Sequence, residues 1–215
     1  WKAAEAQVGD DFHINPEEIE SKYFGVLTKI FNVARFAGQF KPPDTKPDTL
    51  SNADLWILSE YDRMRKNTEK HWMEIDIYSA TQAVKTFLTG VFPSHWMEMA
   101  KSRLYEDDPS AAWTLHTVLS GSLAIFSPVC PLFCHHLSNV LYGRSTMYQS
   151  AYPQSPGFSV DLSDSITRSM MKFNAEIWRT KKERNLSLKS PLENVTIPAE
   201  LEDYALDLEK MHSLV

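Results

Sequence analysis

The sequence predicts an all-α fold, a helix bundle of about five main helices with a small α+β appendage at its C-terminus. Apolar residues recur at helical intervals of three and four through most of the 215 residues. Capping residues followed by proline mark two of the expected helix starts. One short β-branched run near the end of the chain is the exception, and it indicates a strand within the appendage.

The first long helix is expected over about residues 16–40. Asn15 can cap this helix, and the following Pro-Glu-Glu suits both the first helical position and the positive end of the helix dipole. The pair Pro42-Pro43 ends it. Its buried face is predicted by apolar residues at Ile19, Tyr23, Val26, Ile30, Val33 and Ala37.

Three further helical tracts follow the Pro-rich link. Ser51 can cap the second helix, which extends to about Glu74 and turns Trp56, Ile57, Tyr61 and Met64 inward. The third covers residues 76–104, and Pro93 should kink or break it. Asp108-Pro109 opens the fourth, which is interrupted at residues 127–131 and resumes toward Leu141.

The C-terminal part is expected to be more irregular. Turn-forming residues fill 143–158, a fifth helix covers 161–182, and a last acidic helix covers 200–211. The run Val195-Thr196-Ile197 predicts a short strand, with residues 186–188 as its candidate partner. We therefore expect two parts: a helical bundle over 1–150, and an extension over 151–215 with a helix, a short strand and a final helix.

Composition limits the function classes. The formal net charge of −6 argues against a generally cationic surface, so any contact with RNA must be local. Two cysteines, Cys130 and Cys134, form no disulfide framework and fit a reducing, cytoplasmic setting. No apolar run is long enough to span a membrane, and we expect no membrane partner. The start at Trp1, without an initiator Met, suggests a piece of a longer chain.

One polar stripe on the first helix is a candidate binding surface. Lys29, Asn32 and Arg35 are three residues apart on a face separate from the apolar stripe. Their ammonium, amide and guanidinium groups suit hydrogen bonding and stacking with unpaired bases. The alternative is an ordinary charged face, with Arg35 paired to an acidic residue. The phenylalanines beside the stripe, Phe31, Phe36 and Phe40, are assigned to the core.

Positive charge is also concentrated between residues 168 and 189, where Arg179, Lys181 and Lys182 are candidate contacts to RNA phosphates. The alternative is a solvated face whose charges pair with Glu176 or Glu183. A metal site usually needs four ligands that converge, and the chain has no second pair of cysteines to complete a site. Cys130 and Cys134 are therefore assigned to core packing, and His135 and His136 to the helix surface. No nucleophile arrangement or Gly-rich phosphate loop occurs, so no catalytic residue is expected.

Several segments resemble one family. The run KIFNVARF at residues 29–36 is similar to the KLWNAARF helix that opens the anticodon-binding domain of class I aminoacyl-tRNA synthetases of the valine, isoleucine and leucine group. DLWIL at 54–58 resembles their DRWIL segment. FSPVCPLF at 126–133 resembles LHPfmPFi, although Cys134-His135-His136 replaces the usual Thr-Glu-Glu. Residues 173–188 are similar to a segment of valyl enzymes of archaeal type.

This resemblance implies a domain that binds the anticodon arm of tRNA, with Asn32 and Arg35 in recognition. The parent would join valine to tRNA using ATP, with the catalytic domain of the same chain as a partner. Neither nucleotide-binding signature of the class occurs here, so the fragment is expected to hold no cofactor and to perform no catalysis, and DNA is not expected as a partner. Two rivals remain: the same domain of an isoleucyl or leucyl enzyme, and a helical protein-interaction module without an RNA role.

Overall fold

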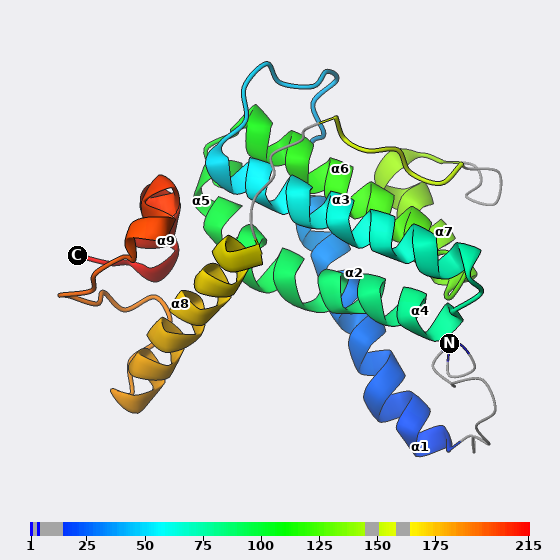
Figure 1. Cartoon of the computed structure of the whole chain (residues 1–215), viewed down its shortest axis with the longest axis horizontal. Helices are drawn as coiled ribbons and strands as arrows, with labels where there is room; N and C mark the ends of the chain where they lie inside the picture. Colours follow the sequence, from blue (N-terminus) through cyan, green and yellow to red (C-terminus); the bar gives the residue numbers. More distant parts are fainter. Residues whose placement is uncertain (2–3, 5–14, 145–150, 158–163) are drawn as a thin grey trace.

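The computed structural model describes residues 1, 4, 15–144, 151–157 and 164–215, and it confirms the all-α fold (Figure 1). Within these residues no strand is present, and no helix is long and apolar enough to span a membrane. The helical elements are α1 Pro16–Glu18, η2 Ile19–Tyr23, α2 Phe24–Ala37, α3 Asn52–Met73, α4 Ile77–Thr86, η3 Phe87–Met97, α5 Glu98–Tyr105, α6 Pro109–Phe126, α7 Pro131–Tyr142, α8 Asp164–Glu183, η4 Ala199–Tyr204 and α9 Ala205–His212.

The predicted capping residues begin these helices as expected. The Asn15 side-chain oxygen accepts a hydrogen bond from the Glu17 amide at 2.9 Å. Ser51 Oγ accepts from the Asp54 amide at 3.2 Å, and Asp108 accepts from the Ser110 amide at 2.8 Å. Each bond satisfies an amide that the first helical turn leaves without a partner. The local sequence therefore determines where α1, α3 and α6 start.

The core lies where α3 packs against α4 and α6. Trp56, Phe92, Trp96 and Phe126 are fully buried there, and their large apolar surfaces dominate the hydrophobic stabilisation of the bundle. Helix α2 crosses the bundle and contacts η3, α6 and α7 (Figure 1). One face of α2 is thereby buried, and the opposite face is left to solvent.

The expected break at Pro93 does not occur. The chain stays helical from Ile77 to Tyr105, and Pro93 lies inside the π-helical stretch η3, Phe87–Met97. Proline cannot donate the usual backbone hydrogen bond of an α-helix, and its ring crowds the preceding turn. The wider π-helical turn accommodates the ring, so the helical path continues from α4 into α5.

The predicted strand at Val195-Thr196-Ile197 is wrong. These residues form an extended connection, in which Val195 and Ile197 pack against the core. Instead, Leu192 forms an isolated parallel bridge with Leu214: the Leu192 amide donates to the Ser213 carbonyl at 3.0 Å, and the Val215 amide donates to the Leu192 carbonyl at 3.1 Å. The β-branched pattern reflects burial of side chains rather than strand pairing.

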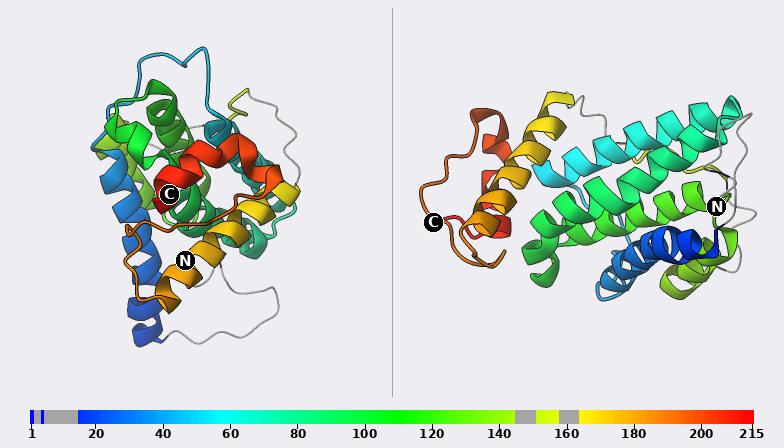
Figure 2. Two further views of the ribbon diagram at one scale, coloured as in Figure 1. Left: turned by 90° about the vertical axis from the view of Figure 1, so that its left-hand side faces the viewer. Right: turned by 90° about the horizontal axis from the view of Figure 1, so that it is seen from below.

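The C-terminal elements α8, η4 and α9 lie together at one end of the bundle (Figure 2). Their apolar side chains, among them Met170, Phe173, Leu201 and Leu208, are buried and belong to the same hydrophobic cluster as the core of the bundle. Helix α9 packs against α5. The division of the chain near residue 150 stays a prediction, and residues 145–150 lie outside the described part.

Candidate nucleic-acid interface

The polar stripe predicted on the first helix lies on the solvent face of α2. Ile30, Val33 and Ala37 are buried on one side, whereas Lys29, Asn32 and Arg35 are exposed on another. These three polar side chains form no ion pair or side-chain hydrogen bond with any residue that the structure describes. Their hydrogen-bonding groups are thus available to a ligand. The alternative in which Arg35 pairs with an acidic residue finds no support among the described residues.

The assignment of all the phenylalanines to the core was wrong in one case. Phe31 is 43% exposed, and Phe24, two helical turns before it, is 68% exposed. Phe36 and Phe40 are half-buried and pack against the core as expected. Helical phase could have separated these residues, because Phe24 and Phe31 fall outside the apolar stripe that includes Ile30 and Val33. The exposed face of α2 therefore combines aromatic and polar groups.

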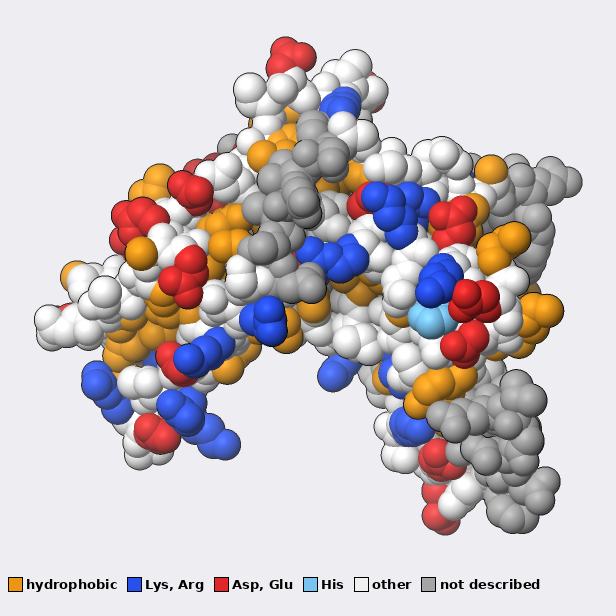
Figure 3. Space-filling view, viewed as in Figure 1, with side chains coloured by type: hydrophobic (Ala, Val, Ile, Leu, Met, Phe, Trp, Pro, Cys, Tyr) orange, Lys and Arg blue, Asp and Glu red, His pale blue; other side chains and the backbone are white. Residues whose placement is uncertain are grey.

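A second group of cations lies on helix α8. Arg179 and Lys182 are exposed, and Arg179 Nε lies 3.9 Å from Glu183 Oε1 across one helical turn. Lys182 has no ion pair with a described residue. Figure 3 shows Lys and Arg side chains gathered along the arm formed by α8, and a hollow between this arm and the one that carries α1. The ion pair between Arg179 and Glu183 is exposed and therefore weak, so Arg179 can exchange Glu183 for another partner.

Lys181 does not belong to this exposed group, which corrects the expectation that it contacts phosphate. Its side chain is fully buried, and Nζ donates to the Leu188 carbonyl at 2.7 Å and to the His212 carbonyl at 2.6 Å. Burial lowers the pKa of the Lys181 ammonium. The side chain points toward α9 because its carbonyl partners lie at the end of α9 and in the loop after α8. Lys181 therefore links the C-terminal end of α8 to the loop after it and to the end of α9.

A buried polar chain joins α8 to both its neighbours. Asn174 donates from Nδ2 to His95 Nδ1 of η3 at 2.8 Å, and its Oδ1 accepts from His212 Nε2 of α9 at 2.7 Å. Burial, reinforced by Lys181 and His95, lowers the pKa of His212 to about 4, and burial also lowers the pKa of His95. Both imidazoles are consequently neutral near pH 7, and neutrality lets His95 Nδ1 accept the hydrogen bond from Asn174.

The N-terminal half of α8 is attached to α3. Trp56 Nε1 donates to Thr167 Oγ1 at 2.9 Å, and Thr167 Oγ1 donates to Glu60 at 2.7 Å. Together with the Asn174 contacts, these bonds fix the direction in which α8 leaves the bundle. Its basic C-terminal end is thus carried on a rigid support, which favours a fixed binding geometry.

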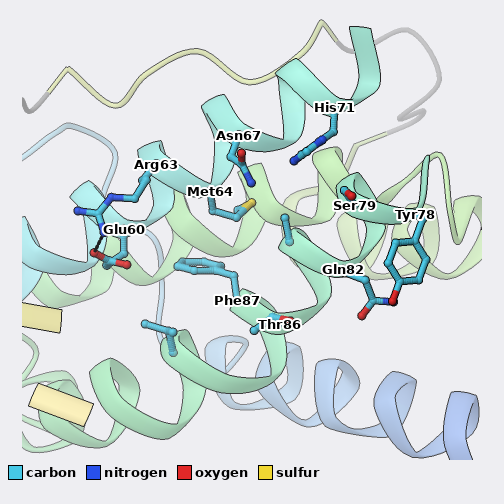
Figure 4. Close-up of a pocket in the computed structure, with 12 residues that line it drawn as sticks. Glu60, Arg63, Met64, Asn67, His71, Tyr78, Ser79, Gln82, Thr86 and Phe87 are labelled. Atoms are coloured by element: carbon cyan, nitrogen blue, oxygen red, sulfur yellow. Dashed lines mark ion pairs between the residues drawn. The ribbon is translucent and has the colours of Figure 1, made fainter. Parts of the chain in front are cut away.

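A groove of about 630 Å³ lies between α3 and α4 (Figure 4). Its floor is apolar, with Met64, Phe87 and Val91, and at its rim Arg63 pairs with Glu60 at 2.9 Å. His71 lies 3.2 Å from Asp76, which caps α4 by accepting a hydrogen bond from the Ser79 amide at 3.0 Å. Among the described residues no group of His, Cys, Asp and Glu side chains could hold a metal ion.

Among the described residues, a helical scaffold presents an exposed polar and aromatic helix face together with a separate basic arm, and this combination is typical of helical nucleic-acid-binding domains. A comparison with protein families identifies the particular one. Residues 54–197 match the model of the anticodon-binding domain of tRNA ligase. This match covers more than half of the chain. The chain belongs to that family.

Individual relatives extend the similarity to the segment that contains α2. The chain is 30% identical to a valine-tRNA ligase of Pyrobaculum aerophilum, over 100% of this chain and 28% of the relative. It is 26% identical to a valine-tRNA ligase of Aeropyrum pernix, over 99% of this chain and 27% of the relative. With a valine-tRNA ligase of Mycobacterium tuberculosis it shares 27% identity over 85% of this chain. The chain thus spans under a third of the length of these relatives.

Proposed function

We propose that this chain binds the anticodon arm of a valine-accepting tRNA, and that its parent protein is a valine-tRNA ligase. Membership of the family of anticodon-binding domains supports the first part, and the relatives described above support the second. Those relatives do not favour an isoleucyl or leucyl parent, and the family match does not favour a protein-interaction module.

The single observation that carries the proposal is the exposed face of α2. Lys29, Asn32 and Arg35 present donors and an acceptor without any partner among the described residues. Exposed polar groups of this kind can bond to the Watson–Crick edges of bases that are splayed out of a loop. Phe31, between Ile30 and Asn32, adds an exposed ring on which a base can stack.

Helix α8 has a different part in this proposal. The exposed cations Arg179 and Lys182 would contact phosphates of the tRNA backbone, which supplies affinity that depends on salt but not on sequence. The basic arm therefore positions the RNA, while the face of α2 reads it. Such a division explains how a chain with net charge −6 binds a polyanion: its positive charge is concentrated locally.

In this account the fragment makes no covalent bond. It holds the anticodon arm so that the acceptor end of the tRNA reaches a distant catalytic domain of the parent, which would use ATP to activate valine. Binding energy gathered at α2 and α8 is used for orientation at the reacting atoms. A cytoplasmic location is part of the same proposal, because the tRNA substrate would be met there.

The test is binding of fluorescently labelled tRNA transcripts to the chain, measured by anisotropy across a range of salt concentrations. We expect the transcript with a valine anticodon to bind more tightly than the transcript with an isoleucine anticodon, and both to weaken as salt rises. No binding at low salt would overturn the proposal. Equal binding of both transcripts would overturn the assignment to valine.

A further inference from the structure

A cluster of aromatic rings lies where the end of α2 meets the end of α5. The rings of Phe36 and Phe40 are 5.0 Å apart, and Tyr105 lies 5.4 Å from Phe40 and 6.4 Å from Phe36, in edge-to-face geometry. The two phenylalanines are half-buried and packed on the core. Tyr105, the outer member, belongs to the last turn of α5.

Tyr105 differs from its neighbours because it is 62% exposed. Its hydroxyl forms no hydrogen bond with a described residue. An open aromatic ring is not required by the core, since Phe36 and Phe40 already cover it. Contact with those two rings nevertheless restricts the side chain of Tyr105. A ring that is held in place yet open loses little conformational entropy when a ligand stacks on it.

The surroundings of the ring carry cations from two helices. Lys101, one turn before Tyr105, places its ammonium 5.9 Å from the centre of the Phe36 ring. Arg35 precedes Phe36 on α2 and is exposed without an ion pair to a described residue. Acidic residues are present as well: Glu98 pairs with Lys101 at 3.1 Å, and Glu106 with Lys210 at 3.6 Å, so both carboxylates are partly neutralised. Asp107 is exposed at the end of the helix.

We propose that Tyr105 is a stacking platform for one unpaired nucleobase of the bound RNA, beside the face of α2. This inference rests on the proposed function and adds a subsite contributed by a second helix. A flat open ring accepts any base, and the guanidinium of Arg35, one residue before Phe36 on α2, can bond to the base edge or to its phosphate. A peptide partner would need an apolar pocket, whereas the two helices that meet at this cluster carry the cations Arg35 and Lys101.

The test uses the full chain and a stem–loop RNA with the valine anticodon, in which 2-aminopurine replaces one loop base at a time. Stacking on a ring quenches the fluorescence of this base analogue, so binding should quench it at one loop position. Tyr105→Leu should abolish that quenching and weaken binding roughly 5- to 100-fold, whereas Tyr105→Phe should keep both. Thermal unfolding confirms that each variant is folded.

The matched control is Tyr78→Ala. Tyr78 lies in the first turn of α4, at the other end of the continuous helix that reaches Tyr105, and roughly 40 Å from Tyr105. This substitution should change neither affinity nor quenching. If the wild-type chain binds the RNA but Tyr105→Leu binds equally well with the same quenching, the stacking subsite is refuted while the proposed function stands. If the wild-type chain binds no RNA, both fail.

Discussion

Arg103 of α5 and Asp54 of α3 form a buried two-point ion pair: Nη1 lies 2.8 Å from Oδ2, and Nη2 lies 2.9 Å from Oδ1. Asp54 is fully buried and also accepts from Trp96 Nε1 and Ser110 Oγ, while Arg103 also contacts Asp108 and Asp207. These carboxylates raise the pKa of Arg103. One guanidinium thus joins α5 to α3, to the cap of α6 and to α9.

Removing this guanidinium should destabilise the whole bundle. Arg103→Met leaves the buried Asp54 charge without its main partner, and we expect a loss of about 3–5 kcal/mol in the free energy of unfolding. Lys70→Met is the control, because Lys70 and Glu74 are exposed and 4.0 Å apart, and it should cost less than about 1 kcal/mol. Urea unfolding followed by tryptophan fluorescence gives both values. Similar losses in the two variants would contradict the central role of Arg103.

Two glycines on helices should respond oppositely to alanine. A Cβ at Gly121 of α6 would collide with the ring and hydroxyl of buried Tyr61, so Gly121→Ala should cost about 1–3 kcal/mol through overpacking. A Cβ at Gly25 of α2 meets nothing within 4 Å, and Gly25→Ala should stabilise by up to about 1 kcal/mol. Thermal unfolding of both variants tests the close packing of α6 on α3. A tolerated alanine at residue 121 would refute it.

The buried imidazole of His212 should make stability fall in mild acid. Its folded-state pKa is about 4, against an ordinary value of 6.5, so between these pH values the unfolded chain binds a proton that the folded chain does not. Stability is therefore greatest above pH 6.5 and declines as pH falls toward 4, by on the order of 2–3 kcal/mol.

His212→Gln keeps a donor for Asn174 but cannot titrate. The decline between pH 6.5 and 4 should become shallower in this variant, as followed by urea midpoints. The exposed His136 provides the control, since His136→Gln should leave the decline unchanged. A profile for His212→Gln that matches wild type would show that other groups cause the acid sensitivity.

Lys181 and Lys182 are adjacent, yet they should act differently on RNA binding. Lys181→Met leaves two carbonyls without a donor and should cost about 1–3 kcal/mol of stability, with no change in the slope of log affinity against log salt. Lys182→Ala should leave stability nearly unchanged and reduce that slope by roughly 0.7–1, because one phosphate contact is lost. If folded Lys181→Met protein showed a reduced slope of log affinity against log salt, Lys181 would contact an RNA phosphate after all.

Structural features that depend on residues close together in the chain could be predicted from the sequence, whereas features that depend on distant residues could not. The starts of α1, α3 and α6 follow from Asn15, Ser51 and Asp108, because a cap involves only the next few residues. The buried face of α2 follows from its apolar period. The continuity of the helix through Pro93 could not be foreseen, because no local pattern indicates that the helix widens into the π-helical stretch η3 around the proline ring.

The candidate site was predicted in part for the same reason. Exposure of the α2 stripe follows from helical phase, and that phase also gives the exposed ring of Phe31. Burial of Lys181 depends on the carbonyl of His212, which lies 31 residues further along the chain. Helical phase does place Lys181 on the buried face of α8, four residues after buried Ile177, whereas Lys182 falls outside it. Long-range hydrogen bonds of this kind separate a structural lysine from one available to RNA.

The face of α2 is the surface that we propose reads the anticodon. The most direct measurement compares Arg35→Ala with wild type for binding to two stem–loop RNAs that differ only in a valine or an isoleucine anticodon, with Lys182→Ala as the control on the basic arm. We expect Arg35→Ala to weaken binding of the valine stem–loop about 5- to 100-fold and to reduce the preference for it over the isoleucine stem–loop, whereas Lys182→Ala should weaken binding of both RNAs equally. An equal loss for both RNAs with Arg35→Ala would make the stripe an ordinary charged helix face and contradict the account.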